Sequence, residues 1–196
     1  KSFGAKGDWS TDDTAAIMSA YAYVSSFRGT LYFPDGGYIC TGLTLGSSGQ
    51  SCTFQGSSFD KHGASSSVSR IILKNGSNVP LITIADTVNG ASHNFHDLLF
   101  DGNGSNQSTE NYVIDILPGS GSGACLYNVH VCWGSGGGIR LGYIRHDNDW
   151  TNVQVYQCGK ASPSAGYGYG IYIDSVDVHG MNIGSGWNTA DGVYIN

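Results

Sequence analysis

The sequence predicts an all-β chain that winds into a parallel β-helix, with one short α-helix near its N-terminus. The 196 residues are poor in charge, at 12%, and include 30 glycines, a composition typical of short strands joined by many turns. Two strand-like phrases alternate from residue 94 onward, which is the pattern of a repeat architecture. One stretch near the start has helical spacing instead.

The first element is the expected helix. Three aspartates lie close together in GDWSTDDTAAI, which spans residues 7–17. Paired carboxylates can serve acid–base catalysis, but the apolar residues that follow are spaced as on one face of a helix. Thr11 is a favourable N-cap, and Asp12 and Asp13 in the first turn would interact favourably with the helix dipole. We therefore predict a helix over about 12–26 and a structural role for these carboxylates.

Two strands are expected next, in GTLYFPDGGYICTGLTL. Residues 30–33 alternate in polarity as a strand does, residues 34–37 have turn composition, and residues 38–45 form a second apolar run.

Three blocks in this region also carry a resemblance. FGAKGD, TDDTAAI and GTLYFPDGGY occur in that order between residues 3 and 38. Together they resemble the opening of the pectate-lyase-like, right-handed parallel β-helix family, which includes polygalacturonase-like enzymes and bacteriophage tailspike and appendage proteins. The resemblance implies a right-handed β-helix whose end is closed by the helix. The pair Trp9-Ser10 departs from the family pattern, where small or polar residues are usual.

The expected organisation is an N-terminal cap over 1–38, with the helix and the first strand, followed by β-helix coils over 39–196. Because the final residues, DGVYIN, have the pattern of a strand, we expect the chain to be a piece of a longer protein.

The first repeated phrase is apolar-x-Asn/Asp-apolar-x-apolar, and its copies recur every 24 to 31 residues. Two short strands in each such repeat suit one turn of a parallel β-helix, which buries its apolar residues by stacking on its neighbours. The copies are FHDLLF (95–100), LYNVHV (126–131), WTNVQV (150–155) and VHGMNI (178–183).

Each copy has a polar or glycine residue before an inward-facing pair. Since Asn, Asp and Gly tolerate left-handed backbone, we predict a column of turns. The column residues are Asp97, Asn128, Asn152 and Gly180, and the inward pairs are Leu98/Phe100, Val129/Val131, Val153/Val155 and Met181/Ile183.

The second phrase is a short strand, in YVIDIL (112–117), GIRLGYI (138–144), GIYIDSV (170–176) and GVYIN (192–196). Alternation places apolar pairs inward and one side chain between them outward. The predicted outer column is Asp115, Arg140, Tyr172 and Tyr194, with coils stacked about 4.8 Å apart.

This column suits a sugar chain, because aromatic rings cover sugar faces while charged groups bond to hydroxyls. Asp115 and Asp174 would lie two coils apart, about 9.6 Å between backbones. Side-chain lean could bring them into the range of an inverting glycosidase pair, about 6.5–9.5 Å. A solvated face with an Asp115–Arg140 ion pair is the alternative.

Further candidates come from IRHDNDW, residues 144–150, the densest charged stretch of the chain, and from DSVDVHG, residues 174–180. Loops that join strands often carry functional groups. The candidate catalytic residues are Asp115, Asp174, Asp147 and Asp149, and the candidate substrate-binding residues are Arg140, Tyr172, Tyr194, Arg145 and His179.

Several functions are disfavoured. The net charge is −6 and the 9 basic residues form no run, which argues against a nucleic-acid partner. No apolar run reaches the length of a membrane span. The five cysteines and the histidines lack ligand spacing, so no metal or cofactor is expected, and the cysteines are expected to be small buried residues, with one disulfide left open.

The leading function is a glycoside hydrolase-type depolymerase that cleaves a bacterial surface or matrix polysaccharide. The resemblance implies a tailspike-like homotrimer, located in a virion tail or secreted. The only Asp-Asp pair is Asp12-Asp13 in the cap, so polygalacturonase catalysis is not carried over. One alternative is a non-catalytic polysaccharide-binding or structural tail fibre or adhesin, in which the candidate aspartates would not converge on one groove. The other is a polysaccharide lyase.

Overall fold

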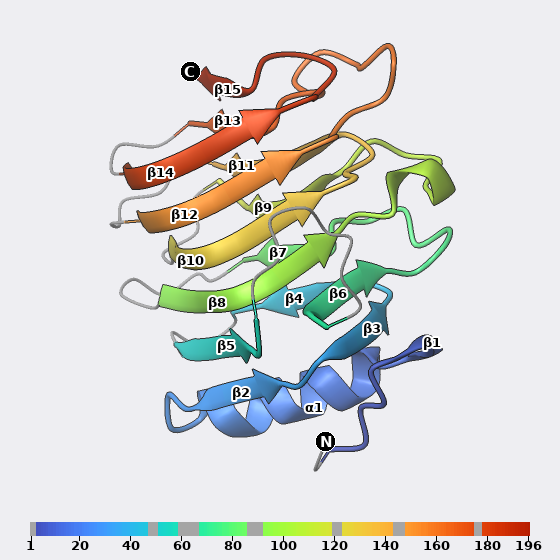
Figure 1. The fold of residues 1–196 in the computed structure, drawn as a ribbon, viewed down its shortest axis with the longest axis vertical. Helices are drawn as coiled ribbons and strands as arrows, with labels where there is room; N and C mark the ends of the chain where they lie inside the picture. Colours follow the sequence, from blue (N-terminus) through green and yellow to red (C-terminus); the bar gives the residue numbers. More distant parts are fainter. Residues whose placement is uncertain are drawn as a thin grey trace.

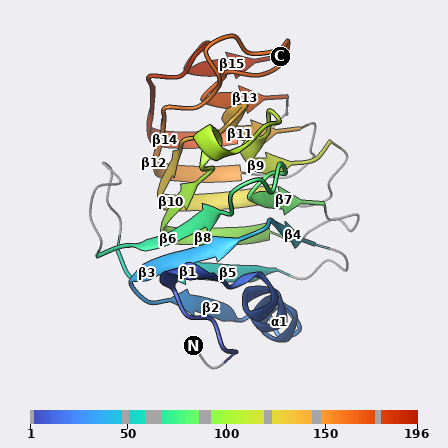
Figure 2. The same ribbon diagram turned by 90° about the vertical axis from the view of Figure 1, so that its right-hand side faces the viewer.

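The chain forms stacked coils, and the predicted right-handed parallel β-helix with an N-terminal helix is confirmed. The computed structural model describes residues 3–46, 51–58, 67–85, 92–118, 123–142, 148–174 and 178–196. The coils follow one another along the long axis, with the N-terminus at one end and the C-terminus at the other (Figures 1 and 2). Among the described residues, no helix is long and apolar enough to cross a membrane.

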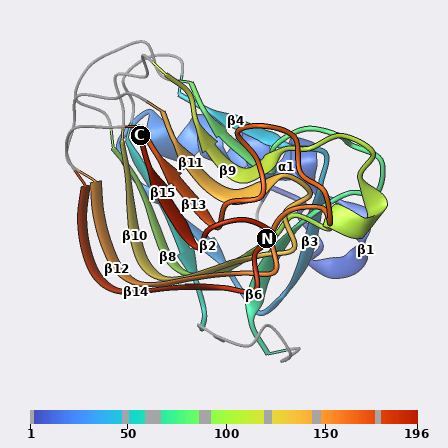
Figure 3. The same ribbon diagram turned by 90° about the horizontal axis from the view of Figure 1, so that it is seen from above.

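The strands form two sheets, in which all pairs are parallel, and the two sheets enclose the core (Figure 3). The helix α1 spans Thr14–Ser25, and a short 3-10 turn spans Gly104–Asn106. The nine-stranded sheet contains β1 (Asp8–Asp12), β2 (Thr30–Phe33), β3 (Gly36–Cys40), β5 (Cys52–Gly56), β6 (Ser69–Leu73), β8 (Ser92–Asp101), β10 (Gly123–Cys132), β12 (Asn148–Tyr156) and β14 (Val178–Gly186). The six-stranded sheet contains β4 (Leu43–Leu45), β7 (Ile82–Ile84), β9 (Tyr112–Ile116), β11 (Gly137–Leu141), β13 (Ile171–Ile173) and β15 (Val193–Ile195).

The long strands of the nine-stranded sheet bend at the predicted column of turns. The backbone is left-handed at each turn residue, with φ angles of 53° at Asp97, 53° at Asn128 and 54° at Asn152. At this bend β8 changes partner, since its first half pairs with β5 and its second half with β6. The side chains form an amide ladder, in which Asn128 Nδ2 donates to Asp97 Oδ1 over 2.8 Å and Asn152 Nδ2 donates to Asn128 Oδ1 over 2.9 Å.

The last copy of this repeat was predicted with the wrong register. Asn182, and not Gly180, continues the column, with a φ of 55° and an Nδ2 that donates to Asn152 Oδ1. Val153 pairs with Ile183, so the inward position falls on Ile183, and Met181 is 66% exposed. The phrase in VHGMNI begins two residues later than expected, because the side chain of Asn182 reaches Asn152 and continues the ladder, whereas Gly180 has no side chain that could do so.

The inward alternation is otherwise as predicted in the middle coils, where the apolar pairs of β9 and β11 are buried. On β15, Val193 and Ile195 are in register with Ile171 and Ile173 but are exposed, because β15 is the last strand of its sheet.

The helix begins later than the sequence indicated, because Thr11 belongs to β1, which pairs with β3. The N-cap is Asp13, whose carboxylate accepts hydrogen bonds from the N–H groups of Lys6 and Gly7. Asp12 accepts from the N–H and hydroxyl of Thr14. Both carboxylates therefore have structural contacts, as expected: Asp13 holds the chain that precedes the helix, and Asp12 binds the first helical residue.

The expected turn and strand after β2 also differ. The glycines at 36 and 37 begin β3, and the run at 38–45 is divided between β3 and β4 at Gly42, which has a φ of 112°.

The five cysteines are described and no disulfide links them. Four are buried and Cys125 is half-buried, and burial raises the pKa of the Cys52 thiol to about 12. They are the small buried residues that the composition indicated.

The N-terminal cap should lose stability at low pH. Hydrogen bonds from the N–H and hydroxyl of Thr11 hold the pKa of Asp8 below its usual value, and the hydroxyl of Thr14 does the same for the pKa of Asp12. A carboxyl whose pKa is lower in the folded state stabilises the fold fully above its ordinary pKa of 3.8, and that contribution is lost as the pH falls through the lowered value. We expect the thermal midpoint to fall between about pH 4 and pH 2, and less steeply in Asp12→Asn. Asp191→Asn removes an exposed carboxylate outside the cap, so its thermal midpoint should fall with pH as steeply as that of the wild type. If the midpoint falls equally steeply in both variants, Asp12 does not contribute to the loss of stability at low pH.

Candidate functional site: the tyrosine face of the six-stranded sheet

The predicted outer column is present on the six-stranded sheet. Asp115 is in register with Arg140, Arg140 with Tyr172, and Tyr172 with Tyr194. Thr83 precedes Asp115 in the same row. We call this surface the tyrosine face, and define it by Asp115, Arg140, Tyr172 and Tyr194 together with the neighbouring Tyr167 and Tyr169, while Tyr112 is buried beside it.

Asp115 and Arg140 form a two-bond ion pair. Arg140 Nε donates to Asp115 Oδ1 and Arg140 Nη2 donates to Oδ2, both over 2.7 Å. The side chain of Asp115 is 8% exposed and that of Arg140 is 31% exposed. Burial lowers the pKa of Arg140, but the hydrogen bonds and charge of Asp115 outweigh burial and raise it overall. The guanidinium therefore stays charged and is held in one orientation at the surface.

The rings beyond Arg140 form a stacked platform. Tyr172 and Tyr194 stack with centroids 5.2 Å apart, and Tyr169 stacks on Tyr194 at 4.7 Å. Tyr112 lies 5.6 Å from Tyr167, and the Arg140 guanidinium lies over the Tyr112 ring at 5.7 Å. This stack places aromatic apolar area beside a fixed positive charge, a combination of groups that suits contact with a sugar chain.

Asp174 follows β13 and lies beside this platform. Its N–H donates to the carbonyl of Leu141 over 2.8 Å, which continues the parallel pairing by one residue. Burial raises the pKa of Tyr172, and the charge of Asp174 adds to that rise. Asp174 is thus electrostatically coupled to the Tyr172 ring.

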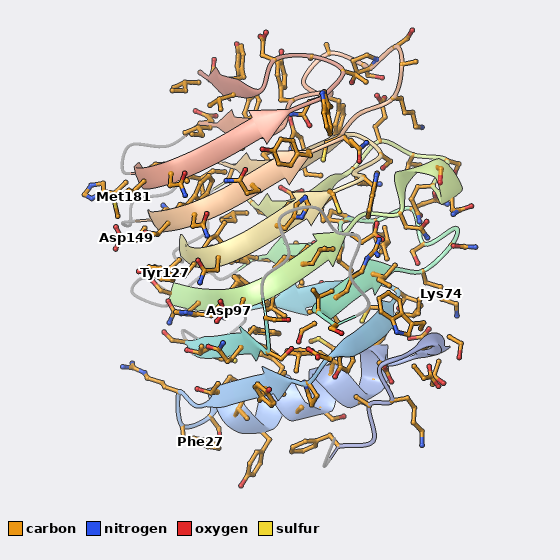
Figure 4. All side chains as sticks on the ribbon, viewed as in Figure 1. Phe27, Lys74, Asp97, Tyr127, Asp149 and Met181 are labelled. Atoms are coloured by element: carbon orange, nitrogen blue, oxygen red, sulfur yellow. The ribbon has the colours of Figure 1, made fainter. Side chains whose placement is uncertain are left out.

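The structure separates the remaining candidates from this face. Asp149 and His179 lie in register on β12 and β14 of the nine-stranded sheet, with Asp149 Oδ1 3.8 Å from His179 Nδ1. They line a hollow of about 260 Å³ together with Tyr127, and Figure 4 shows Asp149 and Tyr127 at the same end of neighbouring strands. The candidates Arg145 and Asp147 lie outside the described residues.

Two tyrosines of the face, Tyr167 and Tyr169, and the buried Tyr112 beside it were missed from the sequence. Tyr167 and Tyr169 alternate with glycine in YGYG directly before β13, a signal that could have been recognised as an outward-facing pair. Tyr112 is in phase with the inward residues of its strand, yet its ring contacts Arg140, and only the fold shows this.

No group of three or more His, Cys, Asp or Glu residues that could hold a metal ion occurs in the described part of the chain.

Comparisons with known proteins agree with this class of fold. The profile of the family described as "Rhamnogalacturonase A/epimerase, pectate lyase-like" matches residues 1–77, so the resemblance to pectate-lyase-like β-helix proteins is confirmed. No curated protein sequence matches the chain significantly.

Two solved structures share the fold. The A-module of the mannuronan C-5 epimerase AlgE4 of Azotobacter vinelandii aligns over 98% of this chain, with a TM-score of 0.66 and 20% identity. The ORF18 protein of Geobacillus virus E2 aligns over 93%, with a TM-score of 0.62 and 17% identity. The chain spans 58% of the length of the first structure and 34% of the second.

Proposed function

We propose that the tyrosine face binds a polysaccharide along the helix axis and that the protein depolymerises it as a glycoside hydrolase. The observation that carries the proposal is the continuous row of paired Arg140 and stacked Tyr172 and Tyr194 on successive coils. A row with this spacing offers repeated contacts to a repeating polymer. The pectate-lyase-like profile and a neighbour that is named as a polysaccharide epimerase support a carbohydrate substrate.

In this proposal the residues of the face have different roles. Tyr172 and Tyr194 stack on sugar rings, and Arg140 donates hydrogen bonds to hydroxyl or carboxylate oxygens. Asp174 is the carboxyl group available for proton transfer beside the platform. Asp115 remains the predicted second carboxylate, and its ion pair also gives it the task of orienting Arg140.

Three other functions are tested with the first. The separation of Asp149 from Asp115, on different sheets, favours a binding or structural β-helix, because that alternative requires candidate aspartates that do not converge. A lyase would leave an unsaturated product, and an epimerase would change neither chain length nor ultraviolet absorbance.

The test is incubation of the protein with a panel of capsular and matrix polysaccharides, followed by reducing ends, ultraviolet absorbance and proton NMR of the polymer. For the hydrolase we expect new reducing ends without absorbance. Asp174→Asn should lower the rate about a hundredfold, since general acid–base groups contribute about 10²–10⁴-fold. Tyr172→Ala should weaken binding about tenfold through the lost stacking.

Asp191→Asn is the matched carboxylate control and should behave as wild type. Undiminished cleavage in Asp174→Asn and Asp115→Asn, together with loss in Asp149→Asn, would move the site to the nine-stranded sheet. Binding without any chemical change to the polymer would establish the non-catalytic alternative.

A homotrimeric assembly in a phage tail is part of the same proposal. It is supported by the fold shared with a phage protein, and sedimentation equilibrium of the whole protein tests it.

A further inference from the structure

A second strip of aromatic and amide side chains lies at another corner of the coils, where the nine-stranded sheet ends. Three of the four tryptophans of the chain are near it, namely Trp9, Trp133 and Trp187, whereas Trp150 is buried in the core. We call this surface the corner strip and define it by Arg70, Asn103, Trp133, Tyr156, Gln157 and Trp187.

The backbone makes these tryptophans unusual. Trp9, Trp133 and Trp187 have φ values of 67°, 52° and 54°, a left-handed conformation that is unfavourable for bulky residues. At the other bend of the long strands the same conformation is met by Asp and Asn, which tolerate it. Bulky residues kept in strained conformations are concentrated at binding sites, which makes this corner a candidate binding surface.

The strip follows the helix axis. The N–H of Trp133 donates to the carbonyl of Tyr156, and the N–H of Gln157 donates to the carbonyl of Gly186. Trp133, Gln157 and Trp187 are therefore equivalent corner residues of three successive coils. The two tryptophans are separated by two coil rises, about 9.6 Å, which is comparable to the length of a disaccharide unit.

Trp133 is held in place from one side. The Arg70 guanidinium lies over the Trp133 ring at 4.8 Å and over the Trp9 ring at 5.8 Å. Arg70 Nη2 is bound by Asp101 Oδ2, and the N–H of Asn103 donates to Asp101 Oδ1. This arrangement orders the ring before any ligand arrives, which lowers the entropic cost of binding.

Two hollows of ligand size meet at Trp133. One, of about 570 Å³, is lined by Arg70, Asn103 and Lys160, and the other, of about 380 Å³, is lined by Gln154, Tyr156 and Trp187. Trp133 and Gln157 line both. The charge of Arg70 is compensated by Asp101, and the Lys160 ammonium donates to the carbonyl of Ser108. Most of the other polar side chains of the two linings are amides and hydroxyls. The core of a protein interface would instead offer apolar side chains around the rings.

We propose that the corner strip is a second carbohydrate site, which holds a neutral, hydroxyl-rich glycan chain along the helix axis with Trp133 and Trp187 stacked on alternate sugars. The site lies on the other sheet from the tyrosine face and does not depend on the function proposed for that face.

The test is a titration of the protein with cellohexaose, mannohexaose and a galacturonic acid hexamer, followed by tryptophan fluorescence and calorimetry. At least one neutral hexamer should bind, and Trp187→Ala and Trp133→Ala should each weaken that binding at least tenfold. Trp187 is 83% exposed, so its removal should leave the thermal midpoint unchanged. Tyr23→Ala removes an exposed ring from α1 and serves as the matched control.

Tyr172→Ala separates the two sites, because it should leave this binding intact. The proposal is overturned if neither neutral hexamer binds, if binding is lost in Tyr172→Ala but kept in both tryptophan variants, or if only the charged hexamer binds. It is also overturned if the wild type self-associates in sedimentation and Trp187→Ala is monomeric with unchanged sugar binding, since the strip would then be a contact between copies.

Discussion

Arg140→Ala is expected to lower the free energy of unfolding by about 3 to 4 kcal/mol, near the lower end of what breaking a buried ion pair costs. Asp115 would remain nearly buried between Thr83 and the rings of the face, with neither of its present hydrogen bonds. The variant would also lose the packing of the guanidinium on Tyr112. Urea denaturation at neutral pH measures the loss.

The double variant Asp115→Ala/Arg140→Ala provides the control. Because it removes both charges, it should be more stable than the sum of the two single variants, by about 1 to 3 kcal/mol of coupling. Additive losses would show that the pair contributes nothing beyond the separate packing of its two side chains, and the argument that Asp115 orients the Arg140 guanidinium would lose its support.

Asn128→Val is expected to cost about 3 to 4 kcal/mol. Asn128 lies in the middle of the amide ladder, donates to the carboxylate of Asp97 and accepts from Asn152. Losing these two bonds, one of them to a charged group, accounts for about 2 kcal/mol. The remainder comes from forcing a β-branched residue into left-handed backbone at a φ of 53°, which costs about 1 to 2 kcal/mol.

Asn128→Gly separates these two contributions. Glycine accepts the left-handed backbone freely, so this variant should lose only the hydrogen bonds and cost about 2 kcal/mol. If valine and glycine destabilise the protein equally, the backbone conformation at the bend is not a constraint and the column of turns has another cause.

The outer column of the six-stranded sheet could be predicted from the sequence because strand alternation is local. Within each short strand, two inward apolar residues determine that the side chain between them points outward. Once the repeat was recognised, stacking of the coils brought Asp115, Arg140, Tyr172 and Tyr194 into one row, and the structure has that row.

Errors arose where a residue's environment depends on its pairing with a distant strand. Thr11 looked like an N-cap, but pairing of β1 with β3 keeps it extended. Gly180 fitted the turn column by composition, but the hydrogen bond to Asn152 selects Asn182.

The sequence by itself determined the architecture, the two repeated phrases and the outward row, because each depends on short-range periodicity that survives stacking. Only the tertiary structure decided that Asp115 is bound by Arg140, that Asp149 belongs to a different sheet, and that Trp133 and Trp187 lie on one corner. These relations join residues 25 to 54 positions apart, and their geometry is set by the register between coils, which no local pattern specifies.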